Sequence, residues 1–533
     1  MTKYELLKLF TLCSFLSLVG VAGYTAQGQT QTERTQENSG ILQLQSNTNA
    51  EPMNVVFILS DDHRYDFMGF MDEAPSYLET PNMDRMARGG AHMKNAFVTT
   101  SLCSPSRASI LTGQYTHRHG VVDNQSAVPD SAIFFPQYLQ KAGYQTGFVG
   151  KWHMGHSSAE PRKGFDYWVS FKGQGKYYNP TLNENGKQVS YSDSTYITSL
   201  LTDKALTFLD ERNKENPFFL YLSHKAVHAN FKPAREDKGT YENEPVNYPS
   251  TMFPPGYDLA DAEGKGFNPE PEDIPSPKEY NYEDVPNWVK EQRHSWHGVD
   301  YMYHGQIQFD DFYHRYLETL LGVDRSIGKV LSYLEKNNLM ENTVVFYMGD
   351  NGFSFGEHGL IDKRQAYEES IRVPLLVYAP SMIAENTKVE PMVQNIDIAP
   401  TILELAGLKR PDNMDGRSFA PMLKGEKMAD WRKRIYYEYF WERPFPQTPT
   451  IHAVRTDSFK YIRYYGVWDI NELYNIQDDP DESNNLIRAD KYRDLSKQLN
   501  SDIFDWLQRT NGMKIPLKPD HGARFDYKYR GTF

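Results

Sequence analysis

The chain is 533 residues long, with 39% hydrophobic residues, 24% charged residues and a net charge of −13. The length favours two or three packed units and exceeds what a simple binding module needs, and the composition excludes a chain that is disordered throughout. The excess of acidic residues argues against nucleic acid as a partner. If the ligand is an anion, positive charge must be concentrated locally.

The N-terminal segment carries a targeting pattern. Lys3 and Lys8 precede an apolar run over residues 9–22, which predicts a signal peptide over residues 1–26. The run is shorter than the ~20 residues that cross a bilayer, so we expect no membrane span after cleavage and a periplasmic or secreted protein. A lipoprotein anchor at Cys13 is disfavoured because the residues just before it are not small. Residues 27–50 are polar and aperiodic, which predicts a disordered linker.

Short apolar runs further along the chain predict buried strands that end in polar side chains. The runs cover residues 54–59, 146–149, 218–222 and 343–348, and they are followed by Asp61-Asp62, Lys151-Trp152-His153, Ser223-His224 and Asp350-Asn351. Helical patterns cover residues 80–88, 135–142, 197–209 and 312–334. Strands that alternate with helices predict an α/β fold whose large, mostly parallel sheet is flanked by helices, with ligands bound at the carboxyl ends of the strands.

Two segments depart from this alternation. Residues 231–299 lose any sustained period, which predicts a loop insertion within a large α/β domain over residues 51–425. Beyond it, alternating apolar patterns over 434–441, 452–455 and 459–464 precede a helical pattern over 492–507. We therefore expect a smaller C-terminal subdomain with an antiparallel sheet over residues 426–533.

Cys13 and Cys103 are the only cysteines, so removal of the signal peptide leaves one thiol and no intrachain disulfide. A small buried hydrophobe is the ordinary role of such a residue, although an unpaired thiol is a liability in an oxidising compartment. Pro105 and Gly113 predict a short helix with Cys103 at or just before its N-terminus. There the helix dipole favours anions and lowers a thiol pKa, and Arg107 adds a cation one turn later. By geometry alone, a capped surface helix remains the ordinary alternative.

The segment Cys103-Ser104-Pro105-Ser106-Arg107, followed by Leu111-Thr112-Gly113, resembles the hallmark of the formylglycine-dependent sulfatases of the alkaline phosphatase superfamily. The resemblance extends over about residues 54–507 and is strongest to bacterial polysaccharide and glycosaminoglycan sulfatases. It implies that a formylglycine-generating enzyme or an anaerobic sulfatase-maturing enzyme converts Cys103 to formylglycine. The hydrated aldehyde would then be the nucleophile toward a sulfated carbohydrate.

The same resemblance implies a metal site. Asp61 and Asp62 match the first pair of metal-binding residues, Asp350 and Asn351 match the second pair, and the modified Cys103 would be a further ligand. Oxygen ligands without His or Cys thiolate suit calcium better than zinc, with magnesium as the alternative. Either acidic pair alone would be read as a solvated turn.

The remaining catalytic positions are also implied by resemblance. Lys151 and Lys363 match the two sulfate-contacting lysines, and Arg107 belongs to the motif. Asp350 would assist deprotonation of the nucleophile, and His153 would take the proton from the second hydroxyl when sulfate leaves. His228 would bind substrate and protonate the leaving oxygen, with His224 as the rival for that role.

The sugar and the position of its sulfate stay open; an algal glycan such as ulvan and a glycosaminoglycan-like glycan both fit. The segment from Tyr280 to His297, which contains Trp296, is predicted to set sugar specificity together with Trp441, His452 and Arg455, with packing at a domain interface as the alternative. Three other functions are weighed: an arylsulfatase, a phosphate or phosphonate ester hydrolase of the same superfamily, and a non-catalytic binder of sulfated glycans.

Overall fold

The centre of the large sheet consists of the strands that the sequence predicts. In the computed structural model, which describes residues 42, 44–46, 52–155, 158–257, 280–300 and 307–516, β9, β1, β8 and β4 lie side by side and parallel. Both faces of these strands are buried, which explains why their sequences are apolar without alternation. Their bounds are β1 (Asn54–Ser60), β4 (Gln145–Lys151), β8 (Phe218–Ser223) and β9 (Thr343–Gly349).

The edges of this sheet are mixed. The full strand order is β13-β2-β12-β9-β1-β8-β4-β5-β6-β7, and the outer pairings β12–β9, β12–β2, β5–β6 and β6–β7 are antiparallel. The expected α/β fold with a mostly parallel sheet is therefore confirmed at its centre. The added strands are β2 (Ala91–Met93), β5 (Tyr167–Phe171), β6 (Thr181–Glu184), β7 (Lys187–Ser190), β12 (Leu375–Tyr378) and β13 (Thr387–Val389).

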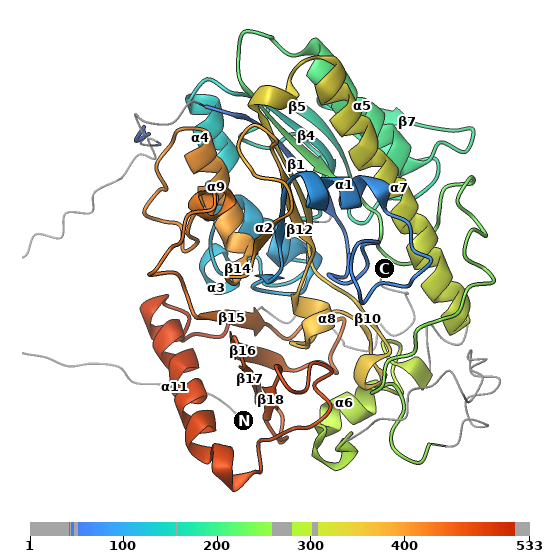
Figure 1. Ribbon diagram of the computed structural model, residues 1–533, viewed down its shortest axis with the longest axis vertical. Helices are drawn as coiled ribbons and strands as arrows, with labels where there is room; N and C mark the ends of the chain where they lie inside the picture. Colours follow the sequence, from blue (N-terminus) through green and yellow to red (C-terminus); the bar gives the residue numbers. More distant parts are fainter. Residues whose placement is uncertain are drawn as a thin grey trace, which may run out of the picture. The chain divides into compact units, whose positions relative to one another are not determined.

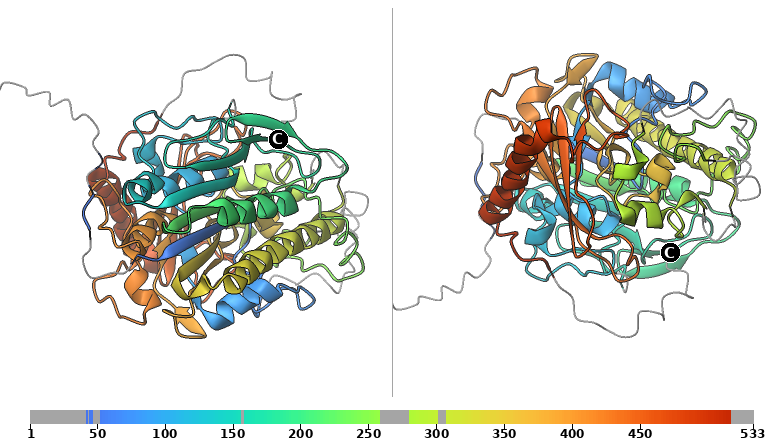
Figure 2. Two further views of the ribbon diagram at one scale, coloured as in Figure 1. Left: turned by 90° about the horizontal axis from the view of Figure 1, so that it is seen from above. Right: turned by 90° about the horizontal axis from the view of Figure 1, so that it is seen from below.

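Helices cover both faces of the sheet (Figures 1 and 2). On one face lie α1 (Pro81–Gly89), α5 (Ile197–Glu211) and α7 (Phe309–Lys336). The other face carries α2 (Cys103–Thr112), α4 (Phe135–Lys141) and α9 (Ile398–Leu405). A large apolar core joins the sheet to α5 and α7. Shorter elements are α3 (Thr116–His119), α6 (Asn287–Gln292), α8 (Glu368–Ile371), α10 (Ala420–Leu423), β3 (Ala96–Phe97), β10 (Ser354–Phe355), β11 (Ile361–Asp362) and β14 (Val393–Gln394).

A separate antiparallel sheet follows, as the sequence predicts (Figure 1). Its strands pair in the order β15-β16-β17-β18, and α11 (Arg493–Arg509) packs on one face of it through Leu499, Ile503 and Trp506. The strands are β15 (Arg434–Tyr439), β16 (Thr450–Thr456), β17 (Phe459–Tyr465) and β18 (Glu472–Asn475).

The signal peptide predicted over 1–26, Cys13 and nearly all of the linker over 27–50 lie outside the described residues, as does the middle of the insertion over 231–299. The part of that insertion that is described consists mainly of loops and contains α6. Within the described ranges, no helix is long and apolar enough to cross a membrane.

Candidate active site

The site lies where the four central parallel strands end. Asp61 and Asp62 follow β1, Lys151 closes β4, and Asp350 and Asn351 follow β9. All five side chains are buried. Gly150 permits the close approach of β4 to β8, because a Cβ atom at this position would meet the carbonyl oxygen of Ser223. The polar ends noted in the sequence are thus brought to one place.

Cys103 is the first residue of α2, as the motif predicts. Leu102 before it is extended, and Gly113 ends the helix in a left-handed conformation with φ of 67°, donating its N–H to Ser109. The Sγ atom of Cys103 lies 3.4 Å from Oδ1 of Asp61. The expected lowering of the thiol pKa is wrong: burial raises the pKa of Cys103, and the charge of Asp61 raises it further. An unmodified Cys103 would therefore be a poor nucleophile at neutral pH.

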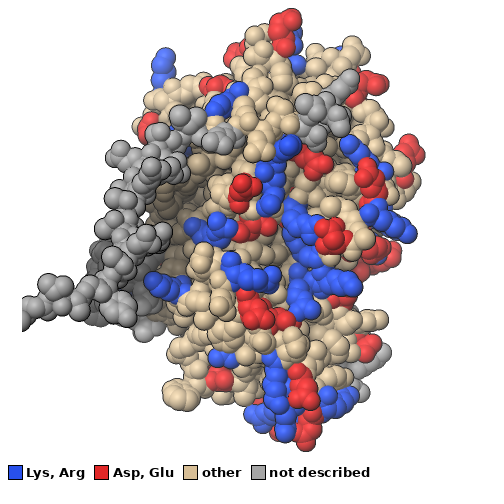
Figure 3. Space-filling model, turned by 90° about the vertical axis from the view of Figure 1, so that its left-hand side faces the viewer, with Lys and Arg blue, Asp and Glu red and all other residues tan. Residues whose placement is uncertain are grey.

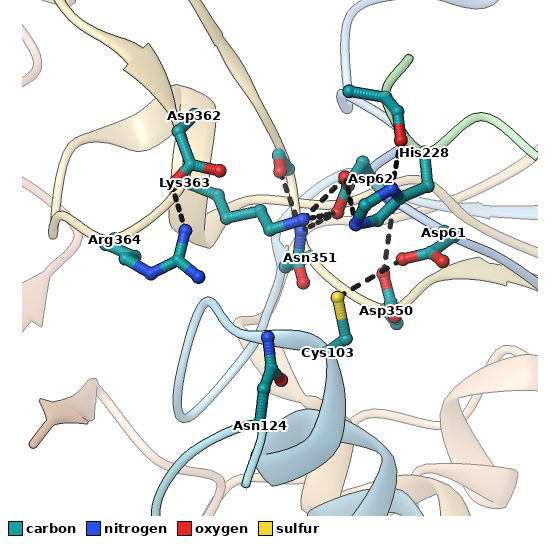
Figure 4. Close-up of polar contacts among 12 residues, drawn as sticks. Asp61, Asp62, Cys103, Asn124, His228, Asp350, Asn351, Asp362, Lys363 and Arg364 are labelled. Atoms are coloured by element: carbon teal, nitrogen blue, oxygen red, sulfur yellow. Dashed lines mark hydrogen bonds and ion pairs between the residues drawn. The ribbon is translucent and has the colours of Figure 1, made fainter. Parts of the chain in front are cut away.

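An acidic cluster faces Cys103 (Figure 4). Carboxylate oxygens of Asp61, Asp62 and Asp350 lie within 4.8 Å of one another. The backbone N–H of Asp62 donates to Asp350 at 3.0 Å, and the amide of Asn351 donates to Asp62 at 2.7 Å. Oδ1 of Asn351 is buried and has no hydrogen-bond partner among the residues that the structure describes. The unpartnered amide oxygen beside three carboxylates fits a divalent cation.

The pKa values in the cluster support this fit. Burial raises the pKa of Asp62 to about 7, and Asp61 and Asp350 add to the rise although Lys363 opposes it. Burial also raises the pKa of Asp350, with Asp61 contributing. At Asp61 burial acts in the same direction, but Lys151 and other cations outweigh it and hold the pKa well below its usual value. A bound cation would favour the ionised form of Asp62 and Asp350.

Three cations line the other side of the cluster. Arg107 donates from Nε to Asp350 at 2.9 Å, and its Nη1 donates to the carbonyl of Lys151 at 2.8 Å. Lys151 is ion-paired with Asp61, and Lys363 is ion-paired with Asp62. Figure 3 shows one face of the molecule, where Lys and Arg side chains are interspersed with Asp and Glu. On that face no broad basic patch is visible, whereas the buried site concentrates cations next to Cys103.

Two histidines lie beside these groups. The hydroxyl of Ser104, the residue after Cys103, donates to the backbone carbonyl of His153 at 2.5 Å. Nδ1 of His228 lies 2.5 Å from the carbonyl oxygen of Ala229, and its Nε2 lies 3.9 Å from Oδ2 of Asp62. Burial lowers the pKa of His228 well below its ordinary value, and Lys363 and Lys151 lower it further. Both histidines therefore lie close to the acidic cluster and the start of α2.

The rival histidine, His224, points elsewhere. Its Nε2 lies 3.0 Å from the hydroxyl of Ser326 on α7, and burial lowers its pKa to about 3. It does not line the pocket described below, whereas His228 does. The geometry favours His228 for contact with substrate.

A pocket with a volume of about 230 Å³ opens over this cluster. Four of the predicted site residues line it: Asp62, His153, His228 and Lys363. The rest of its wall comes from segments spread along the chain, including the direct neighbours of His228 and Lys363. These further lining residues are Asn124, Gln125, Gln174, Ala229, His297, Phe353, Asp362, Arg364 and Phe445.

Comparison with known proteins identifies the family. A family model described as sulfatase matches residues 53–408, which is more than half of the 533-residue chain, and a second, described as N-sulphoglucosamine sulphohydrolase, C-terminal, matches residues 356–509. The chain belongs to the sulfatase family. It is therefore a sulfuric ester hydrolase of the alkaline phosphatase superfamily, as the Cys103 motif indicated. This family uses formylglycine and a divalent metal ion, which agrees with the acidic cluster.

Several relatives of this sulfatase match most of their own length. It is 34% identical over 487 residues to N-acetylglucosamine-6-O-sulfatase of Bacteroides thetaiotaomicron, covering 84% of each chain. It is 31% identical to human N-acetylglucosamine-6-sulfatase, covering 89% of this chain and 88% of the relative. A solved structure of BT4656 in complex with its substrate D-glucosamine-2-N,6-O-disulfate matches with a TM-score of 0.73 and 32% identity, covering 88% of this chain and 100% of that one.

The C-terminal residues predicted to bind the sugar have other partners in this sulfatase. The Arg455 guanidinium is held by Glu368 at 3.0 Å and lies over the ring of Phe97. His452 is buried with its Nε2 3.8 Å from Glu438. Trp441 is 45% exposed, but it is not a lining residue of the pocket. Arg455, His452 and Trp441 are therefore left out of the binding site proposed below.

The sequence patterns did not single out the other pocket residues, although one of them lies inside a predicted segment. His297 falls inside the segment predicted to set specificity, and its Nδ1 lies 3.0 Å from Asp362. Asp362 and Arg364 flank the predicted Lys363, so that lysine was the available signal for them. Phe445 contributes its ring under the Arg364 guanidinium, 3.5 Å from its centre. Nothing in the local sequence around Phe445 indicates that its loop reaches the pocket.

Proposed function

We propose that this sulfatase removes the 6-O-sulfate from N-acetylglucosamine or glucosamine units of a sulfated carbohydrate. The observation that carries the proposal is the pocket over Cys103, whose cations are buried and whose outer wall is rich in hydrogen-bonding side chains. The names of relatives with 31–34% identity over most of the chain support the sugar and the position. A glycosaminoglycan-like substrate is therefore preferred to an algal glycan.

The wall of the pocket suits one sugar ring. Asp362 and the Arg364 guanidinium offer an acceptor and donors for sugar hydroxyls, and Asn124 and Gln174 offer amides. Phe445 adds an apolar surface. The volume of about 230 Å³ is smaller than the ~300–1,000 Å³ of sites for drug-sized ligands, which favours a single sugar ring over a longer stretch of glycan in this pocket.

Cys103 is proposed to be the site of formylglycine, made by a formylglycine-generating enzyme or an anaerobic sulfatase-maturing enzyme. Its place at the start of α2, facing Asp61, supports this assignment. When present, formylglycine would supply a hydroxyl nucleophile that the high-pKa thiol cannot replace. Asp350 is proposed to help remove the proton of that nucleophile.

Calcium is the metal that we propose for the acidic cluster, with magnesium as the alternative. Asp61, Asp62, Asp350 and Asn351 would hold it, together with the modified residue 103. Each of these four side chains offers a hard oxygen ligand. The ion would supply positive charge that stabilises the sulfate group during transfer.

The chain's own cations and histidines have distinct proposed tasks. Lys151 and Lys363 would bind the sulfate oxygens, while Arg107 holds Asp350 and the end of β4 in place. Burial and the nearby Lys363 and Lys151 hold the pKa of His228 well below its ordinary value, which favours the neutral imidazole before substrate binds. The negative charge of a bound sulfate ester favours its protonated form, so His228 can hold the proton for the leaving oxygen. His153 would accept the proton of the remaining hydroxyl of modified residue 103 when sulfate departs.

A panel of substrates tests the proposed specificity. The kcat/KM for sulfate release should be at least tenfold higher for N-acetylglucosamine-6-sulfate than for its 3-sulfate isomer, for 4-sulfated N-acetylgalactosamine and for 4-nitrophenyl sulfate. Cys103→Ala is the control, because it sets the background rate of sulfate release. A non-catalytic glycan binder would release sulfate no faster than this variant. A higher kcat/KM for the 3-sulfate or the galactosamine substrate would overturn the assignment, and preference for the aryl ester would favour an arylsulfatase.

Export is also part of the proposal. The pattern over residues 1–26 supports a periplasmic or secreted enzyme. N-terminal sequencing of the protein from its native host should find a mature chain that begins after about residue 26. A mature chain that still begins at Met1 would contradict export by this signal.

A further inference from the structure

Tyr177 lies under the turn that carries His228. It belongs to the segment between β5 and β6, and its side chain is only 4% exposed. Its hydroxyl donates a hydrogen bond to the backbone carbonyl of His228 at 2.7 Å. Burial raises the pKa of Tyr177 well above its ordinary value, so this hydroxyl stays a donor throughout the working pH range.

Two further polar groups of His228 are held by the backbone. The backbone N–H of His228 donates to the carbonyl of Lys225 at 3.0 Å, and Nδ1 lies 2.5 Å from the carbonyl oxygen of Ala229. Since a carbonyl oxygen only accepts, Nδ1 must carry a hydrogen. Nε2 is the remaining polar atom, and it lies on the side of Asp62, as Figure 4 shows.

Lys225 holds Tyr177 from another side. Its Nζ atom lies 4.6 Å from the centre of the Tyr177 ring, and the residue is 5% exposed. Burial lowers the pKa of Lys225 to about 7, with Lys151 adding to the fall, so the protonated form adds a cation–π attraction to this packing contact. Lys225, Tyr177 and His228 thus form a closed set of contacts: ammonium to ring, hydroxyl to carbonyl, and N–H to carbonyl.

We propose that Tyr177 and Lys225 are positioning residues that hold Nε2 of His228 toward the leaving oxygen of the substrate. This inference rests on the proposed role of His228 in protonating that oxygen. Both residues would act through His228, and neither is among the residues that line the pocket. Their effect should therefore depend on how much the leaving group needs a proton.

The test compares two substrates in matched variants. Tyr177→Phe removes the hydroxyl and keeps the ring for Lys225. Its kcat/KM should fall about tenfold on the sugar sulfate, since general acid catalysis supplies ~10²- to 10⁴-fold and only part of this would be lost. On 4-nitrophenyl sulfate, kcat/KM should fall less than about twofold. The control is Tyr178→Phe, because the neighbouring Tyr178 also donates to a backbone carbonyl, that of Pro233, at 2.7 Å. This control should leave kcat/KM unchanged on both substrates.

Lys225→Met gives a second variant that removes the ammonium and keeps the length of the side chain. It should cause a smaller loss with the same preference for the sugar substrate, and melting temperatures of all variants establish that they are folded. If Tyr177→Phe does not fold, Lys225→Met carries the comparison.

Two outcomes separate this inference from the proposed function. Suppose that His228→Ala lowers kcat/KM selectively on the sugar sulfate. Equal losses of kcat/KM on both substrates for Tyr177→Phe, or losses no larger than those of Tyr178→Phe, would then overturn the positioning role alone. If His228→Ala itself lowers kcat/KM equally on both substrates, the proton-donor role of His228 fails, and the positioning role that depends on it fails as well.

Discussion

At the scale of single residues, the site could be predicted wherever a side chain follows a central strand. Asp61, Lys151 and Asp350 come directly at or after strand ends, and the parallel sheet brings them together. Residues such as Gln174 and Phe445 could not be found in this way, because loops distant in sequence carry them to the pocket. The roles of the clustered residues in catalysis stay proposals.

Lys151 and His228 should differ in their dependence on the leaving group. Lys151→Ala removes a cation next to Asp61 that would contact the sulfate of any substrate, so kcat/KM should fall by similar factors on the sugar sulfate and on 4-nitrophenyl sulfate. His228→Ala should slow the sugar substrate by about 10²- to 10⁴-fold and the aryl substrate far less, because a nitrophenolate leaves without a proton. Measurement of kcat/KM for both variants on both substrates decides the assignment. A selective loss with Lys151→Ala would contradict it.

Removal of the metal should inactivate the enzyme reversibly. A chelator should abolish sulfate release, and calcium should restore it, because the cluster of Asp61, Asp62, Asp350 and Asn351 offers oxygen ligands only. Metal analysis of the purified protein should find about one calcium per chain. Asp62→Ala should lose both the bound metal and the activity. Stoichiometric zinc without calcium would instead support a phosphoesterase-like site.

At the scale of elements, the long apolar runs and helical patterns predicted the buried strands and the helices that flank them. β1 and β9 begin at the predicted residues and end one residue later. The two strands at one edge of the large sheet, β13 and β2, were missed because each has only three residues. Runs of that length carry no readable period. Their pairing is decided by the packing of neighbouring elements.

The contact between α8 and the small sheet should make stability depend on pH. Nζ of Lys460 on β17 forms an ion pair with Glu368 at 3.1 Å and lies 2.7 Å from a carboxyl oxygen of Glu482. Burial raises the pKa of Glu482 to about 8; Glu368 adds to the rise, and Lys460 opposes it. Between about pH 4.5 and pH 8 the folded protein then holds a proton at Glu482 that the unfolded chain has lost. The contribution of this group to stability is present below about pH 4.5 and is lost as the pH rises through about 8.

Glu482→Gln tests this pH dependence, since the amide cannot titrate and still accepts the N–H of Glu368. The melting temperature of the wild type should fall more between pH 5 and pH 8 than that of the variant. Asp481→Asn, a neighbouring change at an exposed carboxylate, is the control and should follow the wild type. Parallel curves for Glu482→Gln and wild type would show that Glu482 does not titrate in this range.

At the scale of the whole molecule, both sheets contribute to one pocket. The large sheet supplies the acidic cluster, and the loop between β15 and β16 supplies Phe445. Glu442 from the same loop binds Arg364 at 2.8 Å, which links the small sheet to the wall of the pocket. The net charge of −13 is compatible with an anionic substrate because the cations that would meet it are buried beside Cys103. The domain boundary predicted at residues 425 and 426 stays a prediction.

The state of residue 103 in active enzyme tests the account most directly. Mass spectrometry of the peptide that contains Cys103, taken from protein with full sulfatase activity, should find the aldehyde of formylglycine in place of the thiol. The modified fraction should rise in proportion to the specific activity across preparations, and Cys103→Ala should fold normally and release no sulfate. Full activity in protein whose Cys103 is entirely an unmodified thiol would contradict the account.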